Sequence, residues 1–200
     1  MNPIIQSLFD RKSCRIFEDK EISQEDKTLI LQEAMQAPSA GNQQMYTIID
    51  VQDKKLQETL SKTCDNQPFI NQAKMVLIFC ADFQKWYDLF KYENCNLRKL
   101  AVGDLLLATT DATIAAQNAV VAAESLGIGS CYIGDILEQH DLHRKLLNLS
   151  EYVVPVCMLV LGYPASDHFK RQKPKRCKLE DIVCVNQYHR KDKQELKRLN

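Results

Sequence analysis

One long apolar stretch constrains the fold of this chain more than any other feature. Residues 104–126, DLLLATTDATIAAQNAVVAAESL, carry small alanines at roughly helical spacing. As a single helix they would extend about 35 Å, as long as a small domain is wide. Asp111, Gln117 and Asn118 lie inside the stretch, and such polar groups are costly in lipid. We therefore expect a buried helix and no membrane span, and the helix is long enough to cross an interface between two subunits.

Shorter elements on both sides of this helix predict the fold class. Residues 22–37 are typical of a helix that Ser23 caps and Pro38 ends, with Ile30, Ala34 and Ala37 on one face. Residues 45–51, 73–82 and 153–163 are short apolar runs of strand type, and the last two are nearly continuous, as in strands covered on both faces. Helical patterns cover residues 54–62 and 83–91. Strands interleaved with helices predict a sandwich of helices and a sheet.

Composition and charge narrow the functional class. The 200 residues are 45% hydrophobic and carry no formal net charge, which favours one globular domain over residues 1–200 and argues against nucleic acid as a partner. The charge is uneven, because residues 168–200 hold eleven basic and four acidic residues and the rest is therefore net −7. We expect a short basic tail from about residue 186. The eight cysteines show no metal or redox spacing and no leader precedes them, which predicts reduced thiols and a cytoplasmic protein.

Four segments carry the chemistry. The first, RKSCR, places Arg11, Ser13 and Arg15 at alternate positions, so an extended chain would present two guanidiniums and a hydroxyl on one face. That pattern suits a phosphate, and it also suits ordinary solvated surface. The others are the polar turn APSAGNQQ at 37–44, the glycine-rich ESLGIGSCYIGD at 124–135, and the basic KPKRCKLEDIV at 173–183, which leads into a predicted short strand.

Taken in order and at their spacing, these segments resemble the four signature regions of the nitroreductase family over residues 5–185. The resemblance implies an α+β fold with a central, mostly antiparallel sheet flanked by helices, and a homodimer whose interface contains the long helix. It also implies FMN bound at that interface, NADPH or NADH as electron donor, and a small-molecule electron acceptor.

Site residues follow from the resemblance motif by motif. The phosphate side would consist of Arg11, Lys12, Ser13, Arg15, Lys173 and one of Lys175 or Arg176. The turn that carries Pro38, Ser39 and Asn42 would reach the flavin ring of the partner subunit. Gln67 would contact the ring, and the backbone of Tyr132, Ile133 and Gly134 would lie beside its N5 atom. No side chain is expected to act as nucleophile or general base, and no metal is expected.

The implied reaction is a ping-pong cycle, in which NAD(P)H reduces the flavin and an acceptor such as a nitroaromatic, a quinone or free flavin then oxidises it. The alternative is a flavin carrier or redox sensor without general reductase activity. Two further expectations concern the surroundings of the site. His140 and His143 belong to an exposed amphipathic helix, and Trp86 and Tyr87 lie either in a mobile lid or in ordinary helix packing.

This sequence departs from the family pattern at three places. Lys12 stands where arginine is more usual, which keeps the charge but loses the planar fork. Asp135 follows Gly134 where some relatives have a second glycine, and its carboxylate would repel an anionic acceptor if it faced the site. The chain ends about 25 residues after KPKRC, whereas the larger NADPH-using branch continues further with an arm over its partner.

Overall fold

The computed structural model describes residues 1–198 and is built around a four-stranded sheet. The strands are β1 (Tyr46–Asp50), β2 (Met75–Asp82), β3 (Gly129–Ile133) and β4 (Val153–Gly162), in the order β1-β2-β4-β3. Every pairing between them is antiparallel. All residues of the central strand β2 are buried, as its continuous apolar run predicts. The predicted α+β class is confirmed.

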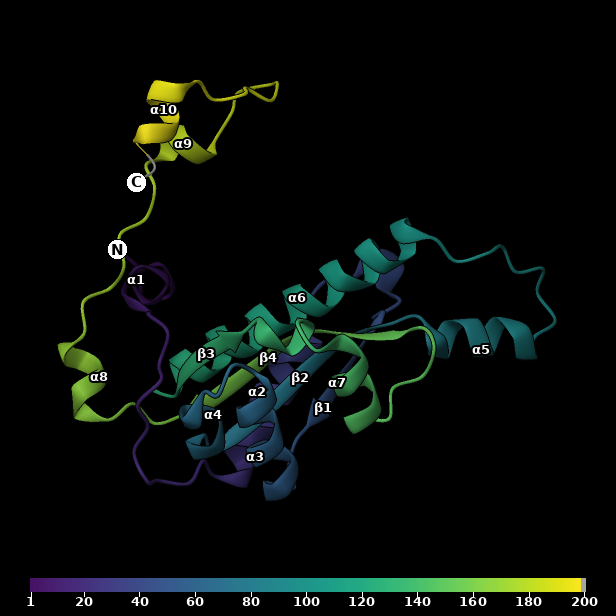
Figure 1. Ribbon diagram of the computed structural model, residues 1–200, viewed down its shortest axis with the longest axis horizontal. Coiled ribbons are helices and arrows are strands. Elements are labelled where there is room, and N and C mark those ends of the chain that lie inside the picture. Colours follow the sequence, from purple (N-terminus) through teal and green to yellow (C-terminus); the bar gives the residue numbers. More distant parts are fainter. Residues whose placement is uncertain (199–200) are drawn as a thin grey trace.

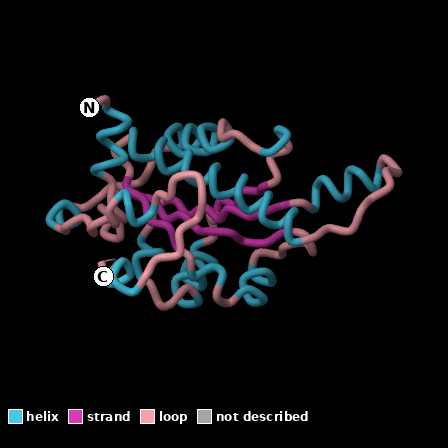
Figure 2. The backbone as a smooth tube through the Cα atoms, turned by 90° about the horizontal axis from the view of Figure 1, so that it is seen from above, coloured by secondary structure: helices cyan, strands magenta, loops and turns pink. Residues whose placement is uncertain are grey.

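Helices cover both faces of this sheet, and Figure 2 shows the strands enclosed between two helical layers. On one face α2 (Gln24–Met35) and α6 (Val102–Ser125) pack on alternate residues of β2 and β4, among them Leu77, Phe79 and Leu159. On the other face lie α3 (Lys54–Thr63), α4 (Pro68–Gln72) and α7 (His140–Leu146). The predicted cap of α2 is present, since Ser23 Oγ accepts a hydrogen bond from the Asp26 N–H at 3.0 Å.

Helix α6 is the predicted long helix, and its alanines face the sheet. Ala108, Ala112, Ala115, Ala119 and Ala123 are all buried, so the helix approaches the strands closely. It is the one helix of residues 1–198 that is long and apolar enough to cross a membrane, but almost half of its most apolar window is buried inside the protein. Its first turns nevertheless leave an exposed apolar face, with Val102 71% and Leu106 61% exposed.

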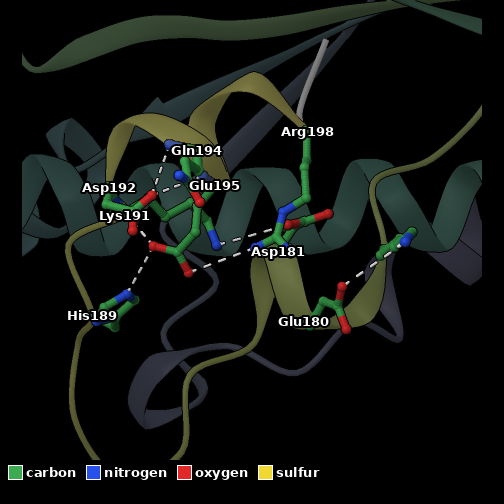
Figure 3. Close-up of polar contacts among 9 residues, drawn as sticks. Glu180, Asp181, His189, Lys191, Asp192, Gln194, Glu195 and Arg198 are labelled. Carbon is green, nitrogen blue, oxygen red and sulfur yellow. Dashed lines mark hydrogen bonds and ion pairs between the residues drawn. The ribbon is translucent and has the colours of Figure 1, made fainter.

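The two ends of the chain lie outside the sandwich. Helix α1 (Pro3–Asp10) precedes it, and α8 (Ser166–Lys170), α9 (Leu179–Ile182) and α10 (Lys193–Lys197) follow it. Figure 1 shows α9 and α10 beyond α1, away from the sheet. The segment between them makes polar contacts with both helices: His189 Nε2 lies 3.0 Å from Glu195 Oε2 of α10, and Lys191 lies 4.0 Å from Asp181 of α9 (Figure 3).

Three sequence predictions need correction. The strand predicted at the end of 173–183 is wrong, because Leu179–Ile182 form the short helix α9. The glycine-rich run contains an unpredicted strand, β3, because Gly129 and the residues after it pair with β4. The helix around 140–146 is not fully exposed, since the His143 side chain is completely buried. The last two residues of the predicted basic tail, 199–200, lie outside the described residues.

The segment after α1 is anchored at one end of the sheet. The Cys14 N–H donates to the Ser130 carbonyl at 2.8 Å, and Phe17 forms an isolated bridge with Pro164. Gly129 and Gly162 make this approach possible. A Cβ on Gly129 would lie 2.7 Å from Cys14 Cβ, and one on Gly162 would lie 2.7 Å from the Phe17 ring.

Candidate functional site

The clearest site is a basic cavity where the N-terminal segment meets the chain after α8. This cavity of about 130 Å³ is lined by Arg11, Lys12, Ser13, Arg15, Arg171, Gln172, Lys173, Pro174 and Arg176. Six of these nine residues are basic and none is acidic, so the cavity is suited to an anion. The structure thus brings together two segments about 160 residues apart in the sequence. Arg176 lines the cavity and Lys175 does not, which separates the two residues that the sequence left as alternatives.

Two lysines tie these segments to each other. Lys12 Nζ donates to the carbonyl oxygens of Phe169, at 3.3 Å, and Arg171. Lys173 Nζ donates to the carbonyl oxygens of Phe9 and, at 3.5 Å, of Leu8 in the last turn of α1. Cations stabilise the carbonyl end of a helix, so Lys173 also fixes where α1 ends. Lys12 lines the same cavity as Arg11, Ser13 and Arg15. The side chains of this segment therefore do not simply alternate between two faces, as the sequence pattern predicted.

Arg11 carries an unused donor. Its Nε atom is buried and has no hydrogen-bond partner among residues 1–198. Arg11 also interacts electrostatically with Glu124 at the end of α6, where burial raises the pKa of the carboxyl group and Arg11 and Lys173 oppose the rise. A buried guanidinium donor without an acceptor is costly unless a ligand supplies one. The cavity lining therefore combines positive charge with an unsatisfied guanidinium donor.

Arg15 connects this cavity to a second group of predicted residues. Its guanidinium carbon lies 5.8 Å from the centre of the Phe69 ring in α4. Ser13 and Arg15 also border Cys131 in β3, where burial raises the thiol pKa and Arg15 lowers it. These contacts form a path of neighbouring residues that leads from the basic cavity along β3 and α4. The path ends at Gln67, just before α4, and at Gly134, just after β3. Cys131 is buried beside this path.

Gln67 and Asp135 meet at the end of that path. Gln67 Nε2 donates to Asp135 Oδ2 at 2.9 Å and to the Cys64 carbonyl at 3.0 Å, so both amide hydrogens are used. Gly134, whose backbone was predicted to lie beside the flavin, is exposed directly before Asp135. Tyr132 and Ile133 precede it in β3, and the Tyr132 hydroxyl donates to Gln117 Oε1 of α6 at 3.3 Å. These predicted ring contacts are therefore neighbours.

The turn at 37–44 is positioned by a buried acid that the sequence analysis did not place in the site. Asp111 of α6 is 2% exposed, and its two carboxylate oxygens accept from the Ala40 N–H at 3.0 Å and the Met45 N–H at 3.2 Å. Within the turn, Ser39 Oγ accepts from the Gln44 N–H at 3.0 Å. Pro38 and Asn42 are exposed, and Asn42 has a φ of 56°. The turn is thus rigidly held with polar groups facing outward.

This turn and the basic cavity lie at opposite ends of the sheet. Met45 accepts from the Asp82 N–H at the Val153 end of β4, whereas Glu18 donates to Tyr163 at the Gly162 end. Ten residues of strand separate these ends, which is roughly 30 Å. Within one subunit the turn and the basic cavity are therefore well separated.

A larger, mostly apolar cavity lies beside the same turn. It has a volume of about 420 Å³ and separates α5 (Gln84–Tyr92) and the loop after it from α6. Gln43, Tyr87, Phe90 and Leu107 are among the residues that line it. Trp86 Nε1 donates to the Gln43 carbonyl at 2.8 Å, which ties α5 to the turn. Figure 1 shows α5 projecting from the body of the protein.

The residues present fit FMN. The orphaned Arg11 donor and the surrounding cations suit its phosphate, and the path past Phe69 leads to Gln67 and to the exposed backbone at Gly134. Sequence reasoning missed Arg171 and Gln172 in the cavity. The sequence signal that could have found them is the run of basic residues that begins at Lys170, just before the KPKRC motif.

Comparisons with known proteins agree with this assignment. The family model described as "Nitroreductase family" matches residues 8–163. The chain is 38% identical to an "FMN reductase [NAD(P)H]" of Bacillus subtilis, over 86% of this chain and 70% of that protein. It is 34% identical to an "Oxygen-insensitive NADPH nitroreductase" of Salmonella typhimurium, over 99% of this chain and 80% of that protein.

Solved structures give the same result. NfrA2 of B. megaterium superposes with a TM-score of 0.91 at 37% identity, covering 98% of this chain and 79% of that one. An NADPH:FMN oxidoreductase from Vibrio harveyi complexed with NAD+ superposes with a TM-score of 0.88 at 27% identity, covering 98% and 82%.

Proposed function

Since this chain belongs to the nitroreductase family, we propose that it works as a homodimer that passes electrons from NAD(P)H to a small acceptor by a ping-pong cycle. Its activity class is that of an NAD(P)H-dependent FMN oxidoreductase, with FMN and NAD(P)H as cofactors. The nature of the acceptor, the dimer and the order of the cycle are parts of the proposal.

The observation that carries the proposal is the basic cavity with its orphaned Arg11 donor. Arg11, Lys12, Ser13, Arg15, Lys173 and Arg176 would hold the phosphate of FMN. Gln67 and the backbone at Tyr132, Ile133 and Gly134 would orient its ring. When bound, FMN supplies the hydride- and electron-transfer chemistry, and the protein supplies position and electrostatics. NAD(P)H and the electron acceptor would bind in turn at the same open face of the flavin ring, which gives the ping-pong order.

The exposed apolar surfaces support the homodimer. The first turns of α6 expose Val102 and Leu106, and α1 exposes Ile4 and Phe9 at 66% and 63%. The C-terminal segment exposes Leu179 at 79% and Val185 at 82%. Exposed apolar patches on a soluble protein are typical of protein–protein contacts. A second copy of the chain that covered these surfaces would also bring its own 37–44 turn to the flavin ring.

A complementation experiment tests this shared site. We expect a variant that lacks the cavity cations, Arg11→Ala/Arg15→Ala, and a turn variant, Asn42→Ala, each to lose activity as homodimers. Mixed dimers contain one site in which both defects fall together and one site that is intact. Refolding the two variants together should therefore restore up to half of the wild-type activity per mixed dimer. If the turn served its own subunit, each site of the mixed dimer would keep one defect and no activity would return.

A further inference from the structure

Among residues 1–198, Asp135 is the one acidic side chain that forms a hydrogen bond with a residue predicted to contact the flavin ring. It is half-buried, and its only side-chain hydrogen bond in the described chain is the one from Gln67 Nε2 at 2.9 Å. It forms no ion pair among residues 1–198, although six basic residues line the basic cavity at the other end of the same path. Its negative charge is therefore not neutralised within the described subunit.

The carboxylate is held in place by a network that joins two segments. His143 is fully buried, and its Nδ1 lies 2.7 Å from the Ile136 carbonyl while its Nε2 lies 2.8 Å from Thr63 Oγ1. The Ile136 carbonyl accepts from Nδ1, so the imidazole joins the chain after Asp135 to Thr63. Gln139 Nε2 donates to the Thr63 carbonyl at 2.7 Å. The chain around Asp135 is thus fastened to the chain that leads into Gln67.

This network also determines what Gln67 offers to a ligand. Both hydrogens of its amide point to the Asp135 carboxylate and the Cys64 carbonyl, which leaves the carbonyl oxygen as the free group. The Gln67 carbonyl oxygen beside the Asp135 carboxylate gives this edge of the site a negative electrostatic potential. An uncompensated charge in a partly buried site acts over several ångströms, because the protein screens it less than water does.

We infer that Asp135 is a specificity-determining residue that disfavours anionic electron acceptors relative to neutral ones of the same shape. The inference rests on the proposed function, because it assumes that the acceptor binds beside the flavin ring that Gln67 contacts. Neutral nitroaromatics and quinones would enter without penalty. Acceptors that carry a carboxylate or sulfonate near the reacting group would be repelled.

The test compares two ligands of nearly the same shape, anionic 4-nitrobenzoate and neutral 4-nitrobenzamide. Their dissociation constants are measured without NAD(P)H, from the change that each produces in the absorbance of the FMN-loaded protein. Asp135→Asn removes the charge, and its remaining oxygen can still accept from Gln67. We expect it to tighten nitrobenzoate binding about fivefold and to leave nitrobenzamide binding within twofold. The gain should shrink in high salt. Asp135→Glu, which keeps the charge, should behave as the wild type does.

Asp141→Asn is the matched control, because it makes the same change on a side chain that is 93% exposed in α7. It should alter neither dissociation constant. Equal nitrobenzoate binding by the wild type and Asp135→Asn would overturn the inference, as would an equal gain in Asp141→Asn. Failure of the proposed function would appear differently, as a wild-type protein whose FMN is not reduced by NADPH or NADH.

Discussion

Replacing both Arg11 and Arg15 with alanine should weaken FMN binding by at least about a hundredfold. Each guanidinium can make charge-assisted hydrogen bonds to a phosphate, worth about 1.5–3 kcal/mol each. Arg11 adds a specific contribution, because its buried Nε has no other partner among residues 1–198. The measurement is a titration of the FMN-free protein with FMN, followed by quenching of flavin fluorescence. The loss should be smaller in high salt, where the wild type is itself weakened.

The control for this variant removes the same charge elsewhere. Lys175 and Arg190 are both exposed, and neither lines the basic cavity. Lys175→Ala/Arg190→Ala should therefore change the FMN dissociation constant less than about threefold, as expected for long-range charge alone. Arg176→Ala should weaken binding more than Lys175→Ala does. If the two double variants lost affinity equally, net charge and not the cavity would account for flavin binding.

Replacing Asp111 with alanine should destabilise the protein by on the order of 3 kcal/mol. The substitution leaves two N–H groups, those of Ala40 and Met45, without their acceptor, and the second of these bonds is buried. Thermal unfolding should show a midpoint lower by roughly 10 °C for a chain of this size. Asp111→Asn keeps the volume but can accept from only one of the two groups with its single oxygen, so it should fall between alanine and wild type.

The same substitution should reach the flavin through the turn. If Asp111 positions Ser39 and Asn42, Asp111→Ala should loosen FMN binding at temperatures where the protein is still folded. Asp141→Ala, on the exposed face of α7, should change the unfolding midpoint by less than about 2 °C and leave FMN binding unchanged. Unchanged stability in Asp111→Ala would mean that Asp111 does not anchor the turn.

Local patterns predicted most of the sandwich because they report burial directly. The continuous apolar runs of β2 and β4 and the alanine face of α6 are visible in the sequence, and each lies in the core. Strand β3 was missed because its short run contains Gly129 and Ser130, which disfavour a strand locally. Pairing with β4 and the close approach of Cys14 decide its conformation, and both are long-range contacts.

The site was predictable where motifs carry it and not where the fold assembles it. The resemblance pointed to Arg11, Arg15 and Lys173, and the structure places them around one cavity. It could not choose between Lys175 and Arg176, because that depends on which way an irregular segment turns. Asp111 was visible only as a polar residue inside an apolar helix. Its role depends on a turn some 70 residues away, which no local pattern encodes.

An anaerobic titration with NADPH and NADH, followed by absorbance, tests the central claim most directly. The purified protein, loaded with FMN, should be yellow and should bleach when one of the two donors is added. Subsequent addition of 4-nitrobenzamide or a quinone should restore the colour, as a ping-pong cycle requires. A protein that binds FMN but does not bleach with either donor would contradict the proposed reductase function and favour a carrier or sensor. A protein that takes up no FMN would contradict the assignment of the basic cavity as well.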